Sequence, residues 1–157
     1  MRKILSSGLA VFAGMVSLPS QVSVWQSHRV QVPDYRKDPR SQSIQQFFAR
    51  FECPAQDYSQ AFVEAADAYN LDWRLLPSIS YVESTGGKNA IHNNLFGWDS
   101  GRAEFSSPVA GIHEVGYRLA NSSLYRNKDL DEILATYNPL PEYVAKVKWV
   151  MQRIGEN

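Results

Sequence analysis

The chain of 157 residues contains a single cysteine, Cys53, so no disulfide can form within it. A lipoprotein anchor would place a cysteine directly after an N-terminal apolar run, and Cys53 lies too far downstream for that role. A catalytic thiol would need a histidine or a helix start beside it, and neither clearly accompanies Cys53-Pro54. We therefore predict that Cys53 is a small, buried apolar residue.

Histidine is also scarce, and its spacing is not that of a metal site. His28, His92 and His113 are far apart, whereas a zinc-binding helix places two histidines four residues apart. The G-x-S-x-G motif of serine hydrolases and the glycine-rich loops that bind phosphate are absent as well. These absences argue against metal-dependent, serine-hydrolase and nucleotide-binding activities, and we predict no metal and no cofactor.

The chain has no excess of charge of either sign, because 16 basic residues balance 16 acidic ones. A neutral chain exerts no overall attraction on nucleic acids, so we predict no nucleic-acid partner. Its hydrophobic content of 44% is that of an ordinary globular protein, and its length is that of one domain. We expect one globular domain that is a monomer.

No apolar run reaches the roughly 20 residues that a membrane-spanning helix needs. Arg2 and Lys3 precede a shorter run of apolar and small residues from Ile4 to Leu18, which is the order of a secretory signal. An uncut N-terminal membrane anchor is the alternative, since no clean A-x-A cleavage site follows. We predict a signal peptide or anchor over residues 1–22, and an exported protein of the periplasm or cell envelope.

The next segment is polar and lacks helical periodicity, so we predict a basic linker over residues 23–43 that tethers the domain to a membrane or wall. From Ile44 onward, apolar residues recur at helical spacing and no strand pattern competes. The sequence therefore predicts an all-α domain over residues 44–157. The linker contains two prolines and three basic residues, which are Pro33, Pro39, Arg36, Lys37 and Arg40.

Capping residues divide the helical region into five or six short helices. Between residues 88 and 106 the helical period is lost, and we predict a functional loop or a small β excursion there. Residues Val144, Val147, Met151 and Ile154 are expected to face the core on the last helix. The predicted helix signals are N-caps at Asp57, Asp72, Ser107 and Asp129, stops at Asn70 and Gly86-Gly87, and a start at Pro141.

Glu83 is the first candidate for a catalytic residue. It shares a predicted helix face with Leu76 and Ile79 and precedes the long loop, so its carboxylate is expected beside apolar residues at a cleft. Desolvation raises the pKa of a carboxyl group, and a protonated acid can donate to the leaving oxygen of a glycoside. The alternatives are a salt bridge to Arg118 or Lys146, or an ordinary exposed glutamate.

Three motifs resemble the lysozyme-like superfamily. Tyr81–Gly87 (YVESTGG) resembles the Glu-Ser pair that ends the catalytic helix of lytic transglycosylases. Asn93–Trp98 (NNLFGW) is similar to the Asn-Asn-Leu-Phe-Gly motif of bacterial glucosaminidases, a branch of the same superfamily. Ala135–Pro139 and Pro141–Val147 resemble both the Tyr-Asn motif of transglycosylases and the Thr-x-x-Pro-x-Tyr-x-x-Lys-Val stretch of glucosaminidases. The matches follow the family order between Asp57 and Ile154.

The resemblance implies a lysozyme-like helical domain around a catalytic cleft, with Glu83 as general acid and Tyr137 near the substrate acetamide. The resemblance implies substrate-binding roles for Ser84, Asn94, Phe96, Gly97, Trp98 and Asn138. Some of these residues also have a structural alternative. Ser84 could cap the end of the helix, Phe96 and Trp98 could pack the loop onto the core, and Tyr137 could simply be buried.

The chain departs from glucosaminidases after the Asn-Asn-Leu-Phe-Gly match, where those enzymes carry a longer lobe with a second acid. Here Asp99 and Glu104 are the only candidates for that acid. The short loop favours a route in which the 2-acetamido group assists and no second carboxylate is needed. We therefore predict transglycosylase-like cleavage of the MurNAc-GlcNAc β-1,4 bond of peptidoglycan. The alternatives are a hydrolytic endo-β-N-acetylglucosaminidase that uses a second acid, and an inactive peptidoglycan-binding module.

Overall fold

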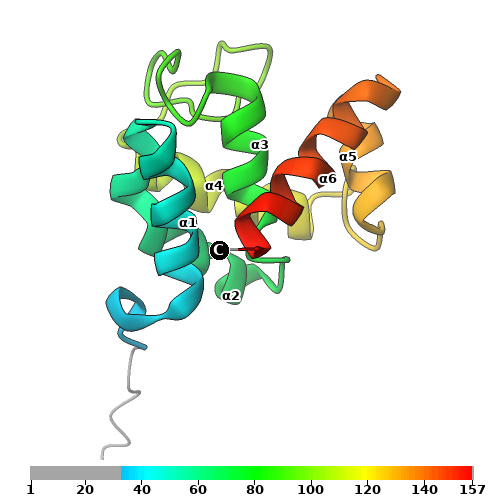
Figure 1. Cartoon of the computed structure of the whole chain (residues 1–157). Helices are drawn as coiled ribbons and strands as arrows, with labels where there is room; N and C mark the ends of the chain where they lie inside the picture. The colour runs from blue at the N-terminus through cyan, green and yellow to red at the C-terminus, as the bar shows by residue number, and fades with distance from the viewer. Residues whose placement is uncertain (1–32, 157) are drawn as a thin grey trace, which may run out of the picture. The chain divides into compact units, whose positions relative to one another are not determined.

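The computed structural model describes residues 33–156, and this part is all-α, as the sequence predicts (Figure 1). The predicted signal or anchor over residues 1–22 lies outside the described residues. Within residues 33–156, the β structure is a single bridge between Ile91 and Asn94, so the predicted loop is irregular. The elements are η1 (Tyr35–Lys37), α1 (Pro39–Arg50), η2 (Pro54–Tyr58), α2 (Ser59–Tyr69), α3 (Leu75–Ser84), α4 (Pro108–Asn121), α5 (Leu130–Tyr137) and α6 (Pro141–Gly155).

The helical domain begins earlier than predicted, because α1 starts at Pro39 inside the segment predicted as a linker. Asp38 caps the helix by accepting a hydrogen bond from the backbone N–H of Arg40 at 2.8 Å, and a proline at the first helical position suits this start. The Arg40 guanidinium also pairs with Asp67 on α2, at 2.7 Å. Ser41 is buried. The end of the predicted linker is therefore part of the folded domain.

Two of the predicted helix starts are wrong by a few residues, whereas the stop at Asn70 is confirmed by its left-handed backbone. Asp57 does not cap α2, because the 3₁₀ helix η2 precedes α2 and leads directly into Ser59. Asp72 accepts a hydrogen bond from Arg74 N–H at 2.9 Å, but α3 begins only at Leu75. In the second half of the chain, the predicted starts at Ser107, Asp129 and Pro141 are confirmed.

The core lies between α1, α2, α3, α4 and α6, where α2 packs against α4 and α3 packs against α6. In Figure 1, the green helix α3 lies between the cyan α1 and the orange-red α6. Val147, Met151 and Ile154 are buried as predicted, whereas Val144 is only half-buried and Tyr143 takes its place in the core. None of the helices within residues 33–156 is long and apolar enough to cross a membrane.

The end of α3 is fixed by close packing around a glycine. The helix closes on Thr85 in a left-handed conformation, and Gly86 follows with φ of +59°. A Cβ on Gly86 would lie 2.7 Å from the Cβ of Cys53 and 2.8 Å from Phe48. Cys53 is fully buried here, as predicted. This packing fixes the last turn of α3, which carries Glu83.

Candidate active site

Glu83 lies on the last turn of α3 and faces the loop that follows. Its Oε2 is so close to the backbone of Gly97 that a Cβ on this glycine would be 2.7 Å away. By surface area the residue is exposed, whereas Leu76 and Ile79 on the same helix face are buried. The apolar face of α3 therefore ends at Glu83, because the helix reaches the surface at its last turn.

The Glu83 carboxyl group is nevertheless partly desolvated. The surrounding protein raises its pKa above the ordinary value of 4.5, with burial as the largest cause. One side of Glu83 is open to solvent, while its Oε2 packs against the backbone of Gly97. The solvation of the carboxyl oxygens sets the pKa, so the contact of Oε2 with Gly97 raises it although the residue as a whole is exposed. Glu83 forms no salt bridge within residues 33–156, so neither predicted ion pair is present.

Two residues of α6 oppose this rise in the pKa of Glu83. The nearby Tyr143 hydroxyl favours the ionised carboxylate, and so does the positive charge of Lys146. Tyr143 is 7% exposed, and among the described residues its hydroxyl has no partner of standard hydrogen-bond geometry. We interpret the pair as a close approach of the hydroxyl to the carboxyl group without a standard hydrogen bond. Burial raises the pKa of the Tyr143 hydroxyl, and the nearby Glu83 carboxyl group raises it further.

Tyr137 links α5 to the loop beside Glu83. Its hydroxyl donates a hydrogen bond of 2.6 Å to the backbone oxygen of Phe96, and its ring lies parallel to that of Tyr143 with centroids 6.1 Å apart. Burial raises the pKa of Tyr137 well above 10, and the charge of Glu83 adds to this effect. Tyr137 therefore stays neutral and cannot act as a base at ordinary pH.

The Asn-Asn-Leu-Phe-Gly segment forms a tight turn held by Asn94. The Asn94 Oδ1 accepts hydrogen bonds from the backbone N–H groups of Phe96 and Trp98, at 3.2 and 3.0 Å. Its Nδ2 donates to the oxygen of Trp98 at 3.0 Å. Asn94 is 3% exposed, so it shapes the loop and has no free group for a sugar. This turn places Gly97 against Glu83.

The hydroxyl of Ser84 is hydrogen-bonded to nearby backbone groups. It is within hydrogen-bond distance of the oxygens of Ser80 and Leu95, at 3.1 and 2.7 Å, and it accepts from the N–H of Gly87 at 3.0 Å. Ser84 is buried. Of its two predicted roles, the geometry fits the helix-capping alternative and leaves no hydroxyl free for a sugar.

Phe96 and Asn138, which are also predicted to bind the substrate, make contacts within the protein instead. Phe96 is fully buried and its ring packs edge-on against Phe62, which is the packing alternative. Asn138 ends α5 and accepts a hydrogen bond from the N–H of Leu140 at 3.1 Å. Neither side chain lines the cavity beside Glu83.

A cavity of about 760 Å³ opens beside this turn, between the loop and α4. Trp98 is part of its lining, with its ring 5.6 Å from that of Tyr137 and 6.1 Å from that of Tyr125. Glu83 does not line the cavity itself, but its neighbours Gly97 and Tyr137 do. The predicted residues Gly97, Trp98 and Tyr137 are thus brought together. The lining consists of Gly97, Trp98, Asp99, Ser100, Ala103, Glu104, Phe105, Ser106, Ala110, Glu114, Arg118, Tyr125 and Tyr137.

Both candidates for a second acid line this cavity, and both are exposed. Asp99 pairs with Arg102 at 2.8 Å, and Glu104 lies 3.4 Å from Nδ1 of His92. Neither stands in the partly desolvated surroundings of Glu83. Both candidates are therefore surface carboxylates, separate from the turn that holds Glu83.

Sequence analysis missed three residues of the site as individual candidates, which are Tyr143, Tyr125 and Glu114. Tyr143 lies four residues before Val147, a spacing that places both residues on the buried face of α6. No local pattern marks Tyr125 or Glu114, because they join the site only through the packing of α4 and the segment after it against the loop.

Within residues 33–156, no cluster of histidine, cysteine, aspartate and glutamate side chains could hold a metal ion. Comparisons with protein families, with characterised proteins and with solved structures find no match to this chain.

Proposed function

We propose that the chain cleaves the MurNAc-GlcNAc β-1,4 bond of peptidoglycan strands, with Glu83 as general acid. The observation that supports this proposal best is a single carboxyl group with a raised pKa, placed beside a cavity with four aromatic side chains. A protonated carboxyl can donate to a glycosidic oxygen. Aromatic rings offer flat apolar surfaces on which sugar rings stack. The partly exposed Trp98 is best suited to this role.

The proposed reaction needs no second carboxylate. Glu83 gives its proton to the leaving oxygen while the oxygen of the 2-acetamido group bonds to C1, which breaks the glycosidic bond. The 6-hydroxyl of the same sugar then bonds to C1, the acetamido oxygen leaves, and the Glu83 carboxylate takes the hydroxyl proton. The product ends in a 1,6-anhydro sugar and no water is consumed. The exposure of Asp99 and Glu104, and the salt bridge of Asp99 with Arg102, fit this route better than a two-acid hydrolysis.

The mass of the products distinguishes the candidate functions. The chain is incubated with purified peptidoglycan, and the released fragments are analysed by mass spectrometry. We expect fragments with 1,6-anhydro ends, lighter by one water than hydrolysed ends. Hydrolysed ends would favour the two-acid glucosaminidase and contradict the single-acid route. Binding to peptidoglycan without release of fragments would contradict an enzymatic function and favour the inactive binding module.

Removing the Tyr143 hydroxyl should change the pH dependence of this reaction. The hydroxyl lowers the pKa of Glu83, so Tyr143→Phe raises it. A general acid works only while protonated, and the alkaline limb of the pH profile of kcat/KM should therefore move to higher pH. Lys146→Met should move it the same way, because the charge of Lys146 also lowers this pKa.

Lys148→Met is the matched control, because it removes the same charge from α6 where Lys148 pairs with Asp131 at 2.6 Å. It should leave the limb unchanged. An alkaline limb that stays in place, or moves to lower pH, in Tyr143→Phe would contradict the assigned role of this hydroxyl.

A further inference from the structure

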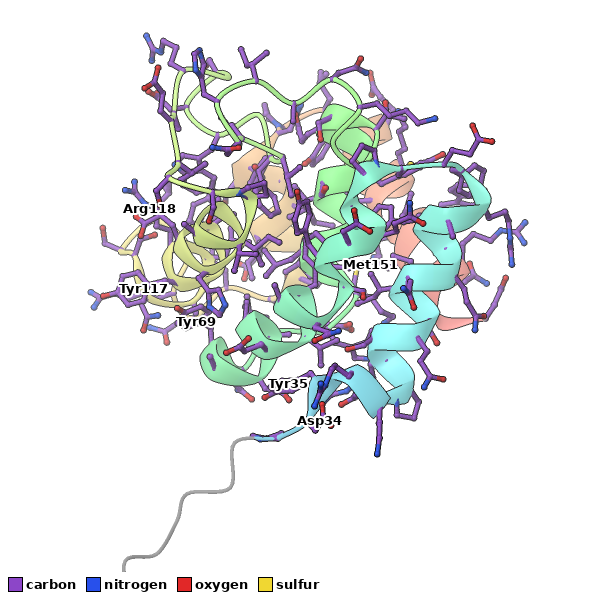
Figure 2. The ribbon with its side chains drawn as sticks, turned by 90° about the vertical axis from the view of Figure 1, so that its left-hand side faces the viewer. Asp34, Tyr35, Tyr69, Tyr117, Arg118 and Met151 are labelled. Atoms are coloured by element: carbon purple, nitrogen blue, oxygen red, sulfur yellow. The ribbon has the colours of Figure 1, made fainter. Side chains whose placement is uncertain are left out.

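Arg118 is the one basic side chain among the described residues that line the cavity. Its Nε donates a hydrogen bond of 2.6 Å to Glu114 one turn earlier on α4. Its guanidinium also lies over the ring of Trp98, 5.8 Å from the centroid. Figure 2 shows Arg118 on α4, on the side of the helix nearer the loop. Two neighbours therefore hold the guanidinium at the cavity.

This arrangement leaves one edge of the guanidinium free. Within residues 33–156, the two Nη groups of Arg118 have no hydrogen-bond partner, since Glu114 takes only Nε. Two parallel N–H donors on a planar group match the two oxygens of a carboxylate. The aromatic support limits the rotamers that binding must freeze, so a carboxylate would bind at a low cost in entropy.

The acids around the cavity do not prevent an anion from binding. Asp99 is neutralised by Arg102 at 2.8 Å, and the side chain of Glu104 is 71% exposed, where water and salt screen its charge. Glu114 is already paired with Arg118. The Nη edge therefore attracts a carboxylate through its two hydrogen-bond donors rather than through an excess of positive charge in the cavity.

We propose that Arg118 recognises a carboxylate carried by the glycan substrate, with Glu114 and Trp98 as its positioning residues. This inference rests on the proposed function. A muramyl sugar carries a lactyl group whose carboxyl is free in strands stripped of peptide and amide-bonded in strands with peptide. The peptides bring carboxylates of their own. Chitin oligomers carry neither, so Arg118 distinguishes wall glycans from neutral polymers of N-acetylglucosamine.

The test measures binding in the Glu83→Gln chain, in which slow turnover allows equilibrium titration by calorimetry. The three ligands are an N-acetylglucosamine oligomer, glycan strands stripped of peptide, and strands that carry peptide. Adding Arg118→Gln should weaken binding of a carboxylate-bearing strand about tenfold, the lower end for a hydrogen-bonded charge. It should leave the neutral oligomer unchanged. An effect confined to stripped strands identifies the lactyl carboxylate, and one confined to decorated strands identifies the peptide.

Two further variants sharpen the result. Arg118→Lys keeps the charge without the two-pronged donor, and we expect it to bind carboxylate-bearing strands nearly as weakly as Arg118→Gln. Lys148→Gln removes one positive charge outside the lining of the cavity, where Lys148 pairs with Asp131, and should leave binding within about twofold of the parent, as an exposed ion pair contributes little. Equal effects of Arg118→Gln on neutral and anionic ligands, or no effect on either, would overturn the inference. Failure of the proposed function appears separately, as the absence of cleavage products from the wild-type chain.

Discussion

Replacing Glu83 by glutamine lowers the rate of glycan cleavage by about 10²–10⁴-fold, the usual contribution of a general acid. The amide has nearly the shape of the carboxyl, so it keeps the contact with Gly97, but it cannot give up a proton to the leaving oxygen. The measurement is release of soluble fragments from purified peptidoglycan. Equal release by the wild-type and Glu83→Gln chains would contradict the role of this residue.

The stability of the variant separates lost chemistry from lost folding. The folded state raises the pKa of Glu83, so its favourable contribution is fully present below the unfolded pKa and is lost as pH rises through the folded pKa. At neutral pH the ionised group therefore adds no stability, and Glu83→Gln should have an equal or higher Tm. Glu64→Gln on the exposed face of α2 is the matched control. It should keep both activity and stability.

Replacing Gly97 by alanine should also inactivate the site, by about 10²-fold, because small displacements of a catalytic group have effects of this size. The new Cβ would lie 2.7 Å from Oε2 of Glu83, so the carboxyl must move. Gly97 also has φ of +59°, where a Cβ costs about 1–2 kcal/mol.

Gly101→Ala provides the control for this strain. Gly101 has φ of +80°, but a Cβ there meets no atom within 4 Å. Both variants should therefore lose a similar free energy of unfolding, measured by denaturant titration, whereas only Gly97→Ala should lose most of its activity. Equal activities in the two variants would show that the contact between Gly97 and Glu83 has no part in catalysis.

Local chemistry explains which parts of the fold the sequence predicts correctly. The capping box of Asp129 and Glu132 and the cap at Ser107 are complete within four residues, so the helix starts are readable from the chain. The starts at Asp57 and Asp72 are wrong because a 3₁₀ helix and a turn delay α2 and α3. Nothing in the side-chain spacing distinguishes these turns from the first turn of an α-helix.

The candidate site is predictable where it depends on one segment, and unpredictable where segments meet. The position of Glu83 before a loop follows from the pattern of α3, but its exposure depends on where the helix reaches the surface. The approach of Tyr143 to Glu83 and of Arg118 to Trp98 depends on the packing of α6 against α3 and of α4 against the loop. Such contacts leave no periodic signal in a single sequence.

The central claim is that the Glu83 carboxyl holds its proton more strongly than an ordinary glutamate. Its titration can be followed directly by ¹³C NMR of the side-chain carboxyl in the labelled wild-type chain, with Glu83→Gln identifying the signal. We predict a midpoint above the ordinary value of 4.5. A midpoint at or below that value would show a carboxylate that water or a positive charge keeps ionised, and would contradict its role as the proton donor.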